Sequence, residues 1–306
     1  MFVGIDVGGT CIKAGVVDEK GNIISRSSVD SCPGSGEEMV RLMYVAMTHA
    51  LDRGLVPKDK ITAVGIGSSG LCDNEKGTMV YSPNIAYDNT PVREYFMERM
   101  DARIDLDNDA NCAAVGEYFA TGEDCGSFVF VTLGTGVGGG IIIDGKLLRG
   151  VNGGGGELGH TVFVPGGRLC GCGQRGCWEA YASVTGLIND ARERGGWFAA
   201  QPEITGRTPF EGAAAGIPEA IEVRDNWINN VALGTCSLVN IFQPDRLVIG
   251  GGISKEGDTL LAPIRKFVEE NAYIHGIPGV RRTEITAAKL GNDAGIVGAA
   301  FLHKIK

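Results

Sequence analysis

Long apolar runs, basic clusters and a secretion signal are lacking from this chain of 306 residues. No apolar run approaches the roughly 20 residues that a membrane-spanning helix needs. Lysine and arginine total 28 against 37 acidic residues, which gives a net charge of −9. Without a basic run, neither nucleic acid nor an anionic membrane is an expected partner. Residues 1–6 follow a strand pattern and place no basic segment ahead of an apolar one, so we expect a cytoplasmic protein that is not secreted.

Two common nucleotide-binding signatures are also absent. No Gly-x-x-x-x-Gly-Lys-Ser/Thr occurs, which excludes a P-loop. No Gly-x-Gly-x-x-Gly opens a helix after the first expected strand, as a dinucleotide-binding fold requires, because the first glycine turn leads into another strand. A hairpin-type phosphate clamp is the arrangement that remains.

Glycine, by contrast, is abundant: it accounts for 48 of the 306 residues, where about 7% is usual. The glycines gather in turns and do not recur with a period, which suggests backbone that comes close to a ligand. Hydrophobic residues make up 43% and charged residues 21%, the ordinary profile of a soluble globular protein. A chain of this length is long enough for two lobes.

Periodicity and turn signals predict an α/β fold with a duplicated beginning. Strands are expected at 2–7 and 11–17 around Gly8, and the pattern returns 126 residues later, where Gly134 corresponds to Gly8. This repetition favours two related lobes with glycine turns facing a cleft, although two glycine-rich hairpins could also coincide by chance. Further strands are expected at 22–29, 61–67, 103–107, 246–249 and 283–289, helices at 35–54, 90–100, 110–121, 181–195, 218–242, 256–273 and 293–304, and a loop at 197–216.

Three glycine-rich turns follow expected strands and could hold phosphate. Glycine lets successive backbone N–H groups approach phosphate oxygens without interference from a Cβ, although each turn alone could simply reverse the chain. Asp6 lies where a carboxylate could hold Mg²⁺ through water, and Lys13 could either neutralise phosphate or be a solvated strand residue. The residues of the three turns are Gly8, Gly9, Thr10, Gly134, Thr135, Gly136, Gly250, Gly251 and Gly252.

Three cysteines within eight residues, Cys170, Cys172 and Cys177, follow His160. Three thiolates and one imidazole complete a tetrahedral zinc shell with no position left for water, which suits a structural metal. The alternatives are a disulfide or a set of unrelated thiols. However, three cysteines cannot all pair with one another, and the Cys-Gly-Cys spacing is too short for an ordinary disulfide. Spacing alone leaves the fourth ligand open between His160, Glu157 and a distant residue. The other six of the nine cysteines are expected to be free thiols in a reducing cytoplasm.

Together these motifs resemble the ROK family of sugar kinases and related regulators, within the actin/hexokinase-like ATPase superfamily. The resemblance covers nearly the whole chain and looks most like the family's bacterial ATP-dependent glucokinases. It implies a two-lobed, ribonuclease H-like fold, with an N-terminal lobe of residues 1–112 joined by a C-terminal helix at 293–306, and a C-terminal lobe of residues 113–292 that carries the zinc loop. The resemblance rests on segments 6–13, 108–109, 134–136, 157–160, 170–179 and 250–252.

The activity that the resemblance implies is ATP-dependent phosphorylation of a hexose at its 6-hydroxyl, foremost glucose to glucose 6-phosphate. N-acetylmannosamine, N-acetylglucosamine, mannose and allose stay open, because one pocket contact decides between epimers. ATP, Mg²⁺ and a structural Zn²⁺ are the implied cofactors, and the expected helices of the second lobe suggest a homodimer or a dimer of dimers. The family's sugar-responsive regulators carry a DNA-reading domain ahead of the Asp-x-Gly-Gly-Thr motif. Because this motif begins at Asp6, we do not expect a regulator, and because Asp109 and both phosphate turns are present, we expect an enzyme and not a silent sugar sensor.

The resemblance also implies roles for individual residues. Asp109 would be the general base for the sugar's primary hydroxyl, whereas the sequence alone favours a helix N-cap at that position. His160 would use one ring nitrogen for zinc and the other for the sugar, while Asn84 also fits plain turn chemistry after Pro83. The nucleotide would contact Asp6, Lys13 and the three glycine turns. The implied sugar-binding residues are Ser69, Gly70, Asn84, Asn108, Asp109, Glu157, His160 and Glu179, and the implied zinc ligands are His160, Cys170, Cys172 and Cys177.

Two features depart from the usual pattern of the family. Cys11 directly follows Thr10, where its thiol either packs into a strand or is sensitive to oxidation. Residues 151–156, just before Glu157, are unusually rich in glycine. We expect these glycines to loosen the sugar loop.

Overall fold

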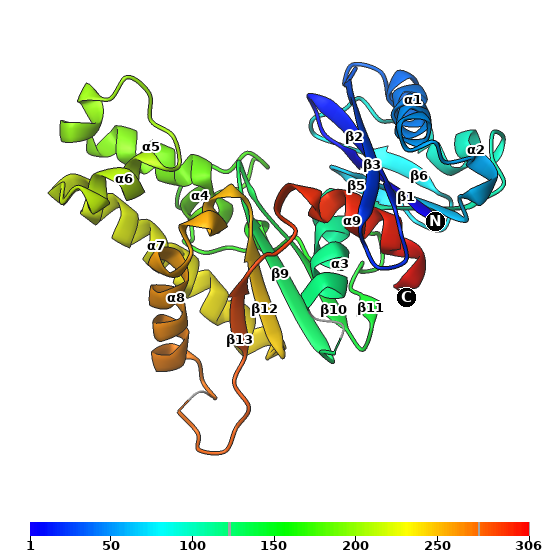
Figure 1. Cartoon of the computed structure of the whole chain (residues 1–306). Helices are drawn as coiled ribbons and strands as arrows, with labels where there is room; N and C mark the ends of the chain where they lie inside the picture. Colours follow the sequence, from blue (N-terminus) through cyan, green and yellow to red (C-terminus); the bar gives the residue numbers. More distant parts are fainter. Residues whose placement is uncertain (122–123, 275, 306) are drawn as a thin grey trace. The chain divides into compact units, whose positions relative to one another are not determined.

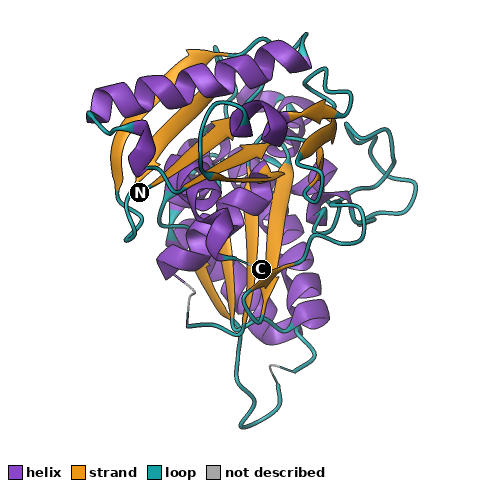
Figure 2. Ribbon diagram, turned by 90° about the vertical axis from the view of Figure 1, so that its right-hand side faces the viewer, coloured by secondary structure: helices purple, strands orange, loops and turns teal. Residues whose placement is uncertain are grey.

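The computed structural model describes residues 1–121, 124–274 and 276–305, and Figure 1 labels its elements. Two five-stranded sheets, a three-stranded sheet and the helices around them make up the described residues. Helices and strands both occur throughout the chain, as Figure 2 shows, which confirms the expected α/β class. Within the described ranges, no helix combines the length and the apolar character that crossing a membrane would need.

The first sheet has the strand order β3-β2-β1-β4-β8. The first three strands form an antiparallel meander, whereas β1, β4 and β8 are parallel. The carboxyl ends of these three parallel strands therefore lie at one edge of the sheet. The strands are β1 Phe2–Val7, β2 Cys11–Val17, β3 Ile23–Asp30, β4 Ala63–Ser68 and β8 Arg103–Asn108.

The second sheet, with the order β11-β10-β9-β12-β13, repeats this plan. In each sheet three consecutive strands lie side by side, and two later parallel strands extend the sheet beyond the first of them. The duplication predicted from the offset of 126 residues is therefore confirmed. The strands are β9 Ser127–Leu133, β10 Val137–Ile143, β11 Lys146–Leu147, β12 Arg246–Gly250 and β13 Glu284–Ala287.

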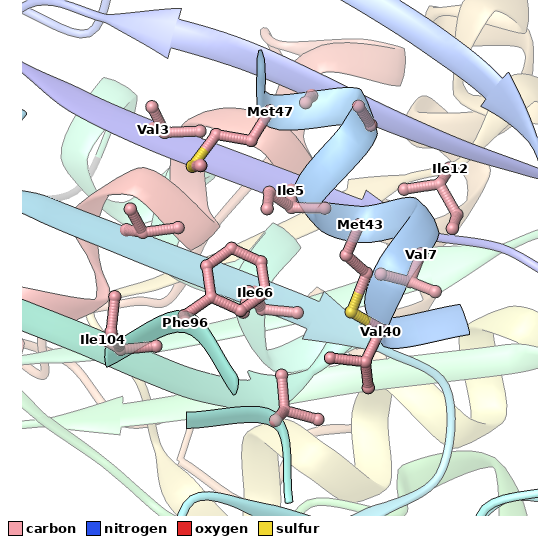
Figure 3. Packing of buried hydrophobic residues seen from close by; sticks show 14 of the residues in the cluster. Val3, Ile5, Val7, Ile12, Val40, Met43, Met47, Ile66, Phe96 and Ile104 are labelled. Carbon is pink, nitrogen blue, oxygen red and sulfur yellow. The ribbon is translucent and has the colours of Figure 1, made fainter. Parts of the chain in front are cut away.

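Helix α1, Gly36–Gly54, covers the first sheet with one apolar face. Ser35 is its N-cap and accepts a hydrogen bond from the amide of Glu38, in the position that a capping box predicts. Figure 3 shows side chains of this helix pointing toward those of the strands, and each such burial contributes roughly 1.5–3 kcal/mol. The labelled residues of this core are Val3, Ile5, Val7, Ile12, Val40, Met43, Met47, Ile66, Phe96 and Ile104.

Helix α9, Ala294–Phe301, packs against β1 and β4 at a distance that only glycine permits. A Cβ added at Gly4 would lie 1.7 Å from the carbonyl oxygen of Ile296. One added at Gly65 would lie 1.7 Å from the carbonyl oxygen of Ala299. Two strand glycines thus bring this helix directly onto the strand backbone.

The segment 197–216 was expected to be a loop, and that prediction is wrong. It holds most of a 3₁₀ helix at Gly196–Ala200 and the helix α6, Thr208–Ala214. Phe210 of α6 packs edge-on against the ring of Trp227, with 6.1 Å between the ring centroids. Tertiary packing therefore forms a helix that is too short for its periodicity to be recognised.

The small third sheet, with the order β5-β6-β7, was not expected either. Its strands are β5 Leu71–Asp73, β6 Thr78–Tyr81 and β7 Thr90–Pro91, and segments of two to four residues carry almost no alternation of apolar and polar side chains. The remaining helices are α2 Val92–Met97, α3 Asp109–Thr121, α4 Glu179–Ala182, α5 Val184–Arg194, α7 Pro218–Phe242 and α8 Asp258–Asn271.

By its contacts, the chain divides into two compact units. Unit 1 holds residues 1–126, 140–156 and 289–306, and unit 2 holds residues 127–139 and 157–288. The lobes expected from the sequence, residues 1–112 with 293–306 and residues 113–292, have other boundaries than these two units. That division into lobes stays a prediction.

Candidate active site

In unit 1, one edge of the first sheet gathers most of the residues predicted for that half of the site. Asp6 on β1 pairs with Gly67 on β4, and Gly67 pairs in turn with Asp107 on β8. The predicted residues that follow these strands therefore lie at neighbouring strand ends. They are Gly8, Gly9 and Thr10 after β1, Ser69 and Gly70 after β4, and Asn108 and Asp109 at the end of β8.

Asp6 is a partly buried carboxylate with one cation nearby. Its side chain is 25% exposed, and its Oδ2 lies 3.8 Å from the Nζ of Lys13 on the adjacent strand. Burial raises the pKa of Asp6, and the charge of Lys13 offsets part of that rise. Because carboxylate oxygens are ligands that Mg²⁺ prefers, Asp6 fits a magnesium site.

The turn at Gly8–Thr10 is held by the strand beside it. The Gly8 amide donates to the carbonyl oxygen of Cys11 at 3.0 Å, and the Ser31 hydroxyl donates to the carbonyl oxygen of Gly8 at 2.6 Å. A Cβ added at Gly9 would have no heavy atom within 4 Å. The backbone at the tip of this turn is therefore open to a ligand.

Asn108 and Asp109 share the start of helix α3. The Ala110 amide lies 2.8 Å from Oδ1 of Asn108 and 2.9 Å from Oδ1 of Asp109, and the Asn111 amide lies 3.4 Å from the same Asn108 oxygen. Asn108 thus takes the larger part in capping, and the N-cap role that the sequence favours for Asp109 falls mainly to its neighbour. Asp109 is the first residue of the helix and is half-buried at the sheet edge.

Further contacts join the other predicted sugar residues of unit 1. Asn108 donates through Nδ2 to the carbonyl oxygen of Gly70 at 3.2 Å. The Ser82 hydroxyl lies 3.3 Å from that of Ser69 and accepts from the amide of Asn84 at 3.2 Å. The exposed Asn84 therefore lies in the turn that the plain turn chemistry predicts, and its role in sugar binding stays a prediction.

The sequence reasoning missed a buried polar cluster behind this edge. Asp107 is only 1% exposed and forms an ion pair with Arg149, whose Nε lies 2.6 Å from Oδ2. Asn74 and Asn111 also donate to its carboxylate, at 3.1 Å and 2.8 Å. The sequence does show an aspartate at the end of a strand, next to the Asn108–Asp109 pair. It does not show the partners of that aspartate, because most of them are far away in the sequence.

Two glycines in the run before Glu157 lie in close backbone contact, while the expected loosening of the loop stays a prediction. Gly153 has a φ of 77°, and a Cβ there would lie 2.5 Å from the carbonyl oxygen of Cys72. A Cβ at Gly155 would lie 2.7 Å from the carbonyl carbon of Arg149. Glycine is needed at both positions because the loop backbone lies directly on its neighbours.

In unit 2, two of the predicted glycine turns lie side by side. Strands β9 and β12 are parallel, and Gly250 pairs with Thr132 two residues before the turn at Gly134. Gly251 has a φ of 87°, and a Cβ there would lie 2.0 Å from the carbonyl oxygen of Leu133. Residues Gly134, Thr135 and Gly136 therefore adjoin Gly250, Gly251 and Gly252 at the carboxyl ends of the two strands.

His160, Cys170, Cys172 and Cys177 come together in unit 2 with their ligand atoms all within 4.8 Å of one another. The Cys172 and Cys177 sulfurs lie 3.7 Å apart, as do the Cys170 sulfur and Nδ1 of His160. A tetrahedral zinc with sulfur ligands at about 2.3 Å has edges close to this length. The donor set and its spacing fit zinc, with Nδ1 as the metal-facing nitrogen. Burial raises the pKa of the Cys170 thiol to about 12, so metal binding must displace its proton.

The short 3₁₀ helix Leu158–His160 places the histidine. A Cβ added at Gly159 would lie 2.1 Å from the carbonyl oxygen of Val137, so the segment lies directly against β10. The His160 amide donates to the carbonyl oxygen of Glu157 at 3.1 Å, and the Glu157 side chain remains exposed. One exposed carboxylate and one cluster ligand thus sit on a single helical turn.

Glu179 connects the cysteine cluster to the turn at Gly134–Gly136. Its Oε2 accepts from the amide of Val137 at 2.9 Å, and its Oε1 accepts from the Cys170 thiol at 3.2 Å. A Cβ added at Gly136 would lie 2.3 Å from the same Oε2. The carboxylate therefore occupies the space that a side chain at position 136 would need.

All nine cysteines have free thiols in the described structure, and Cys170, Cys172 and Cys177 form no disulfide there. Among the six outside the cluster, Cys32 is exposed and Cys11 is partly buried. Burial, together with the nearby carboxylates of Asp107, Asp109 and Asp6, holds the pKa of Cys112 well above its ordinary value. The four buried thiols outside the cluster, Cys72, Cys112, Cys125 and Cys236, act as packing groups.

Comparison with known proteins agrees with this architecture. A glucokinase from Streptomyces coelicolor is 39% identical over 99% of this chain and 98% of its own length. A glucokinase from Thermotoga maritima is 36% identical over 99% of this chain and 97% of its length. The crystal structure of a ROK family glucokinase from Streptomyces griseus, in complex with glucose and AMPPNP, superposes with a TM-score of 0.80 at 38% identity and covers 98% of each chain. The actin/hexokinase-like fold expected from the sequence is confirmed. Because residues 2–306 match the ROK family as a whole, the chain belongs to that family.

Proposed function

We propose that this protein is an ATP-dependent hexokinase that phosphorylates glucose at its 6-hydroxyl. The observation that carries the proposal is the position of Asp109, a half-buried carboxylate at the same sheet edge as the Gly8–Thr10 turn and Asp6. Similarity to a glucokinase with bound glucose and AMPPNP, over 98% of both chains, supports both substrates.

The nucleotide side of the proposal uses the three glycine turns. The tips of these turns would bind the phosphates of ATP: Gly9 and Thr10, next to Gly8, in unit 1, and the paired turns in unit 2. Asp6 would hold Mg²⁺, which supplies charge neutralisation to the phosphates when bound. Lys13, close to Asp6, would add a positive charge beside the same phosphates.

Asp109 would act as the general base. Phosphoryl transfer through a loose transition state requires alignment and charge neutralisation more than covalent chemistry. The carboxylate would accept the proton of the 6-hydroxyl as that oxygen attacks the γ-phosphorus, a contribution of typically about 10²–10⁴-fold. The remaining sugar hydroxyls would bind Ser69, Gly70, Asn84, Asn108, Glu157, His160 and Glu179.

The cysteine cluster would hold a structural zinc. Three thiolates and Nδ1 of His160 close the shell, so the metal leaves no position for substrate. It would fix the 3₁₀ turn that carries His160 and Glu157, which leaves the other imidazole nitrogen available to the sugar. A cytoplasmic location and a homodimer or dimer of dimers stay predictions.

Coupled measurement of ADP release with a panel of sugars tests this proposal. We expect the highest kcat/KM with glucose and lower values with mannose, allose, N-acetylglucosamine and N-acetylmannosamine. A higher value with another hexose would keep the kinase and change its substrate. ADP release with none of these sugars would reject the proposal, and sugar binding without turnover would instead identify a sensor or regulator.

A further inference from the structure

Asp107 is a fully buried carboxylate whose oxygens are divided between two sets of partners. Oδ2 accepts from Arg149 Nε at 2.6 Å and from Asn74 Nδ2 at 3.1 Å. Oδ1 accepts from the backbone amide of Asn108 at 2.9 Å and from Asn111 Nδ2 at 2.8 Å. With four partners at hydrogen-bond distance, the charge is compensated despite a side-chain exposure of 1%.

The two partners of Oδ1 flank Asp109 in sequence. Asn108 supplies the amide just before it, and Asn111 lies two residues after it on the first turn of α3. One oxygen atom thus holds the end of β8 and the start of α3 together. The backbone position of Asp109 depends on that junction.

Arg149 connects the junction to the glycine loop. Its carbonyl oxygen accepts from the amide of Gly155 at 2.7 Å, and Gly153 of the same loop lies against the backbone of Cys72. The loop ends at Gly156, next to Glu157 in the chain. Arg149 therefore contacts the junction through its guanidinium and the stem of the glycine loop through its backbone carbonyl.

We propose that Arg149 and Asp107 are positioning residues that hold Asp109 in the orientation needed for proton transfer. The inference deepens the proposed function and rests on it. A misplacement of about 1 Å of a catalytic group can reduce turnover roughly a hundredfold. Asp107 would not touch the substrate, since its side chain is only 1% exposed, and Arg149 would act through it.

A role in stability alone is the competing explanation. Buried ion pairs are weak evidence for stability, because the cost of desolvation offsets much of the attraction between the charges. The same strand offers an internal comparison in the pair of the exposed Arg103 and the partly buried Asp105, whose side chains are 58% and 21% exposed. That pair has no contact with the Asn108–Asp109 junction among the described interactions.

The test compares Arg149→Lys and Arg149→Ala with the matched controls Arg103→Lys and Arg103→Ala. Lysine keeps the charge but loses the fixed Nε donor, so Arg149→Lys should fold and should lower kcat about tenfold. Arg149→Ala should lower kcat about a hundredfold, and millimolar guanidinium should restore part of it, because Arg149 is 25% exposed. The KM for ATP should stay within about threefold in both variants, and the controls should match the wild type.

Each result decides the matter. If the wild type phosphorylates hexose and both Arg149 variants keep its kcat, the inference falls and the proposed function stands. A loss of kcat that only follows a lowered Tm, with no relief by guanidinium, would assign the pair a purely structural role and overturn the inference. If Arg149→Ala does not fold, Arg149→Lys alone decides by its kcat. A wild type that phosphorylates no hexose would reject the proposed function and the inference together.

Discussion

Among single residues, Asn108 and Asp109 have different tasks: the first caps helix α3 and the second is the proposed general base. Asn108 takes the larger part in capping α3, through the amides of Ala110 and Asn111, while Asp109 begins the helix. The adjacent asparagine therefore preserves the helix cap if Asp109 is replaced.

Asp109→Asn is expected to lower kcat at least about a hundredfold while glucose affinity stays within about tenfold. The substitution keeps the shape of the side chain and removes only its basicity. Steady-state kinetics and calorimetric glucose binding would measure the two effects, with the exposed Asp101→Asn as the control. Turnover like that of the wild type in Asp109→Asn would remove this residue from the role of base.

Asp6→Asn is expected to raise the Tm of the ligand-free protein at neutral pH by about 2 °C and to weaken binding of Mg-ATP. Burial raises the pKa of Asp6 above its ordinary value of 3.8, so the folded state binds the proton more readily than the unfolded state. Stability therefore falls as the pH rises from 3.8 through the folded pKa and stays reduced above it. Asparagine cannot ionise, so the variant should lack this fall.

Thermal scans of both proteins between about pH 4 and pH 7 would measure the difference. Asp18→Asn serves as a control of opposite sign, because hydrogen bonds from Asn22 lower the pKa of Asp18 and make its ionised form stabilising. A lower Tm for Asp6→Asn than for the wild type at pH 7 would contradict the argument.

At the scale of elements, glycine decides how closely helices approach the first sheet. Gly4 and Gly65 place strand backbone against the carbonyl oxygens of α9, and Gly298 does the same for α9 against α3, where a Cβ would lie 1.6 Å from the oxygen of Cys112. Backbone atoms cannot move aside as a flexible side chain can. These contacts explain why the C-terminal helix belongs to unit 1 with the first strands.

Gly65→Ala is expected to lower the Tm by at least about 5 °C or to prevent folding, because its methyl group would overlap the Ala299 carbonyl oxygen. Gly34→Ala is the matched control, since a Cβ there meets no atom within 4 Å. Circular dichroism melts of both variants would test this. Equal Tm values would show that the helix shifts without cost.

The geometry of the cysteine cluster depends more on its four side chains, those of His160, Cys170, Cys172 and Cys177, than on hydrogen-bonded secondary structure. Cys172→Ser should release the zinc, disorder residues 161–178 and reduce both glucose affinity and Tm. Metal analysis of the purified protein, glucose KM and thermal melts would measure the three effects. Cys32→Ser, exposed and outside the cluster, should change none of them. A zinc-free variant with wild-type glucose KM would refute the orienting role.

At the scale of the whole molecule, the predicted binding residues are distributed over both units. Asp6, Ser69 and Asp109 belong to unit 1, while Glu157 and Glu179 belong to unit 2. Each unit contributes its own glycine turns at the carboxyl ends of parallel strands. Ligands that bind only the folded protein stabilise it by mass action.

Glucose together with AMPPNP and Mg²⁺, each at about a hundred times its Kd, is expected to raise the Tm by about 5 °C or more. Differential scanning calorimetry would measure the shift. Sorbitol at the same concentration controls for the general stabilisation that osmolytes produce. No shift beyond that of sorbitol would mean that the folded protein does not bind this set of ligands.

The duplicated α/β plan, the capped first helix and the compact cysteine motif could all be predicted from the order of the residues. These depend on local signals: strand runs around glycine turns, a serine three residues before a glutamate, and cysteines within eight residues of one another. These signals act between residues that are close in the sequence, so they can be recognised without the structure. The short α6 and the small third sheet escaped because packing, not periodicity, forms them.

Contacts between side chains that are distant in the sequence could be found only in the folded structure. The Asp107–Arg149 pair joins residues far apart in the chain, and Glu179 joins the Cys170 thiol to the Val137 amide. Two of the glycines before Glu157 are required by close backbone contact. The energetic effect of a buried charge or a missing Cβ depends on the atoms around it, and the fold brings those atoms together.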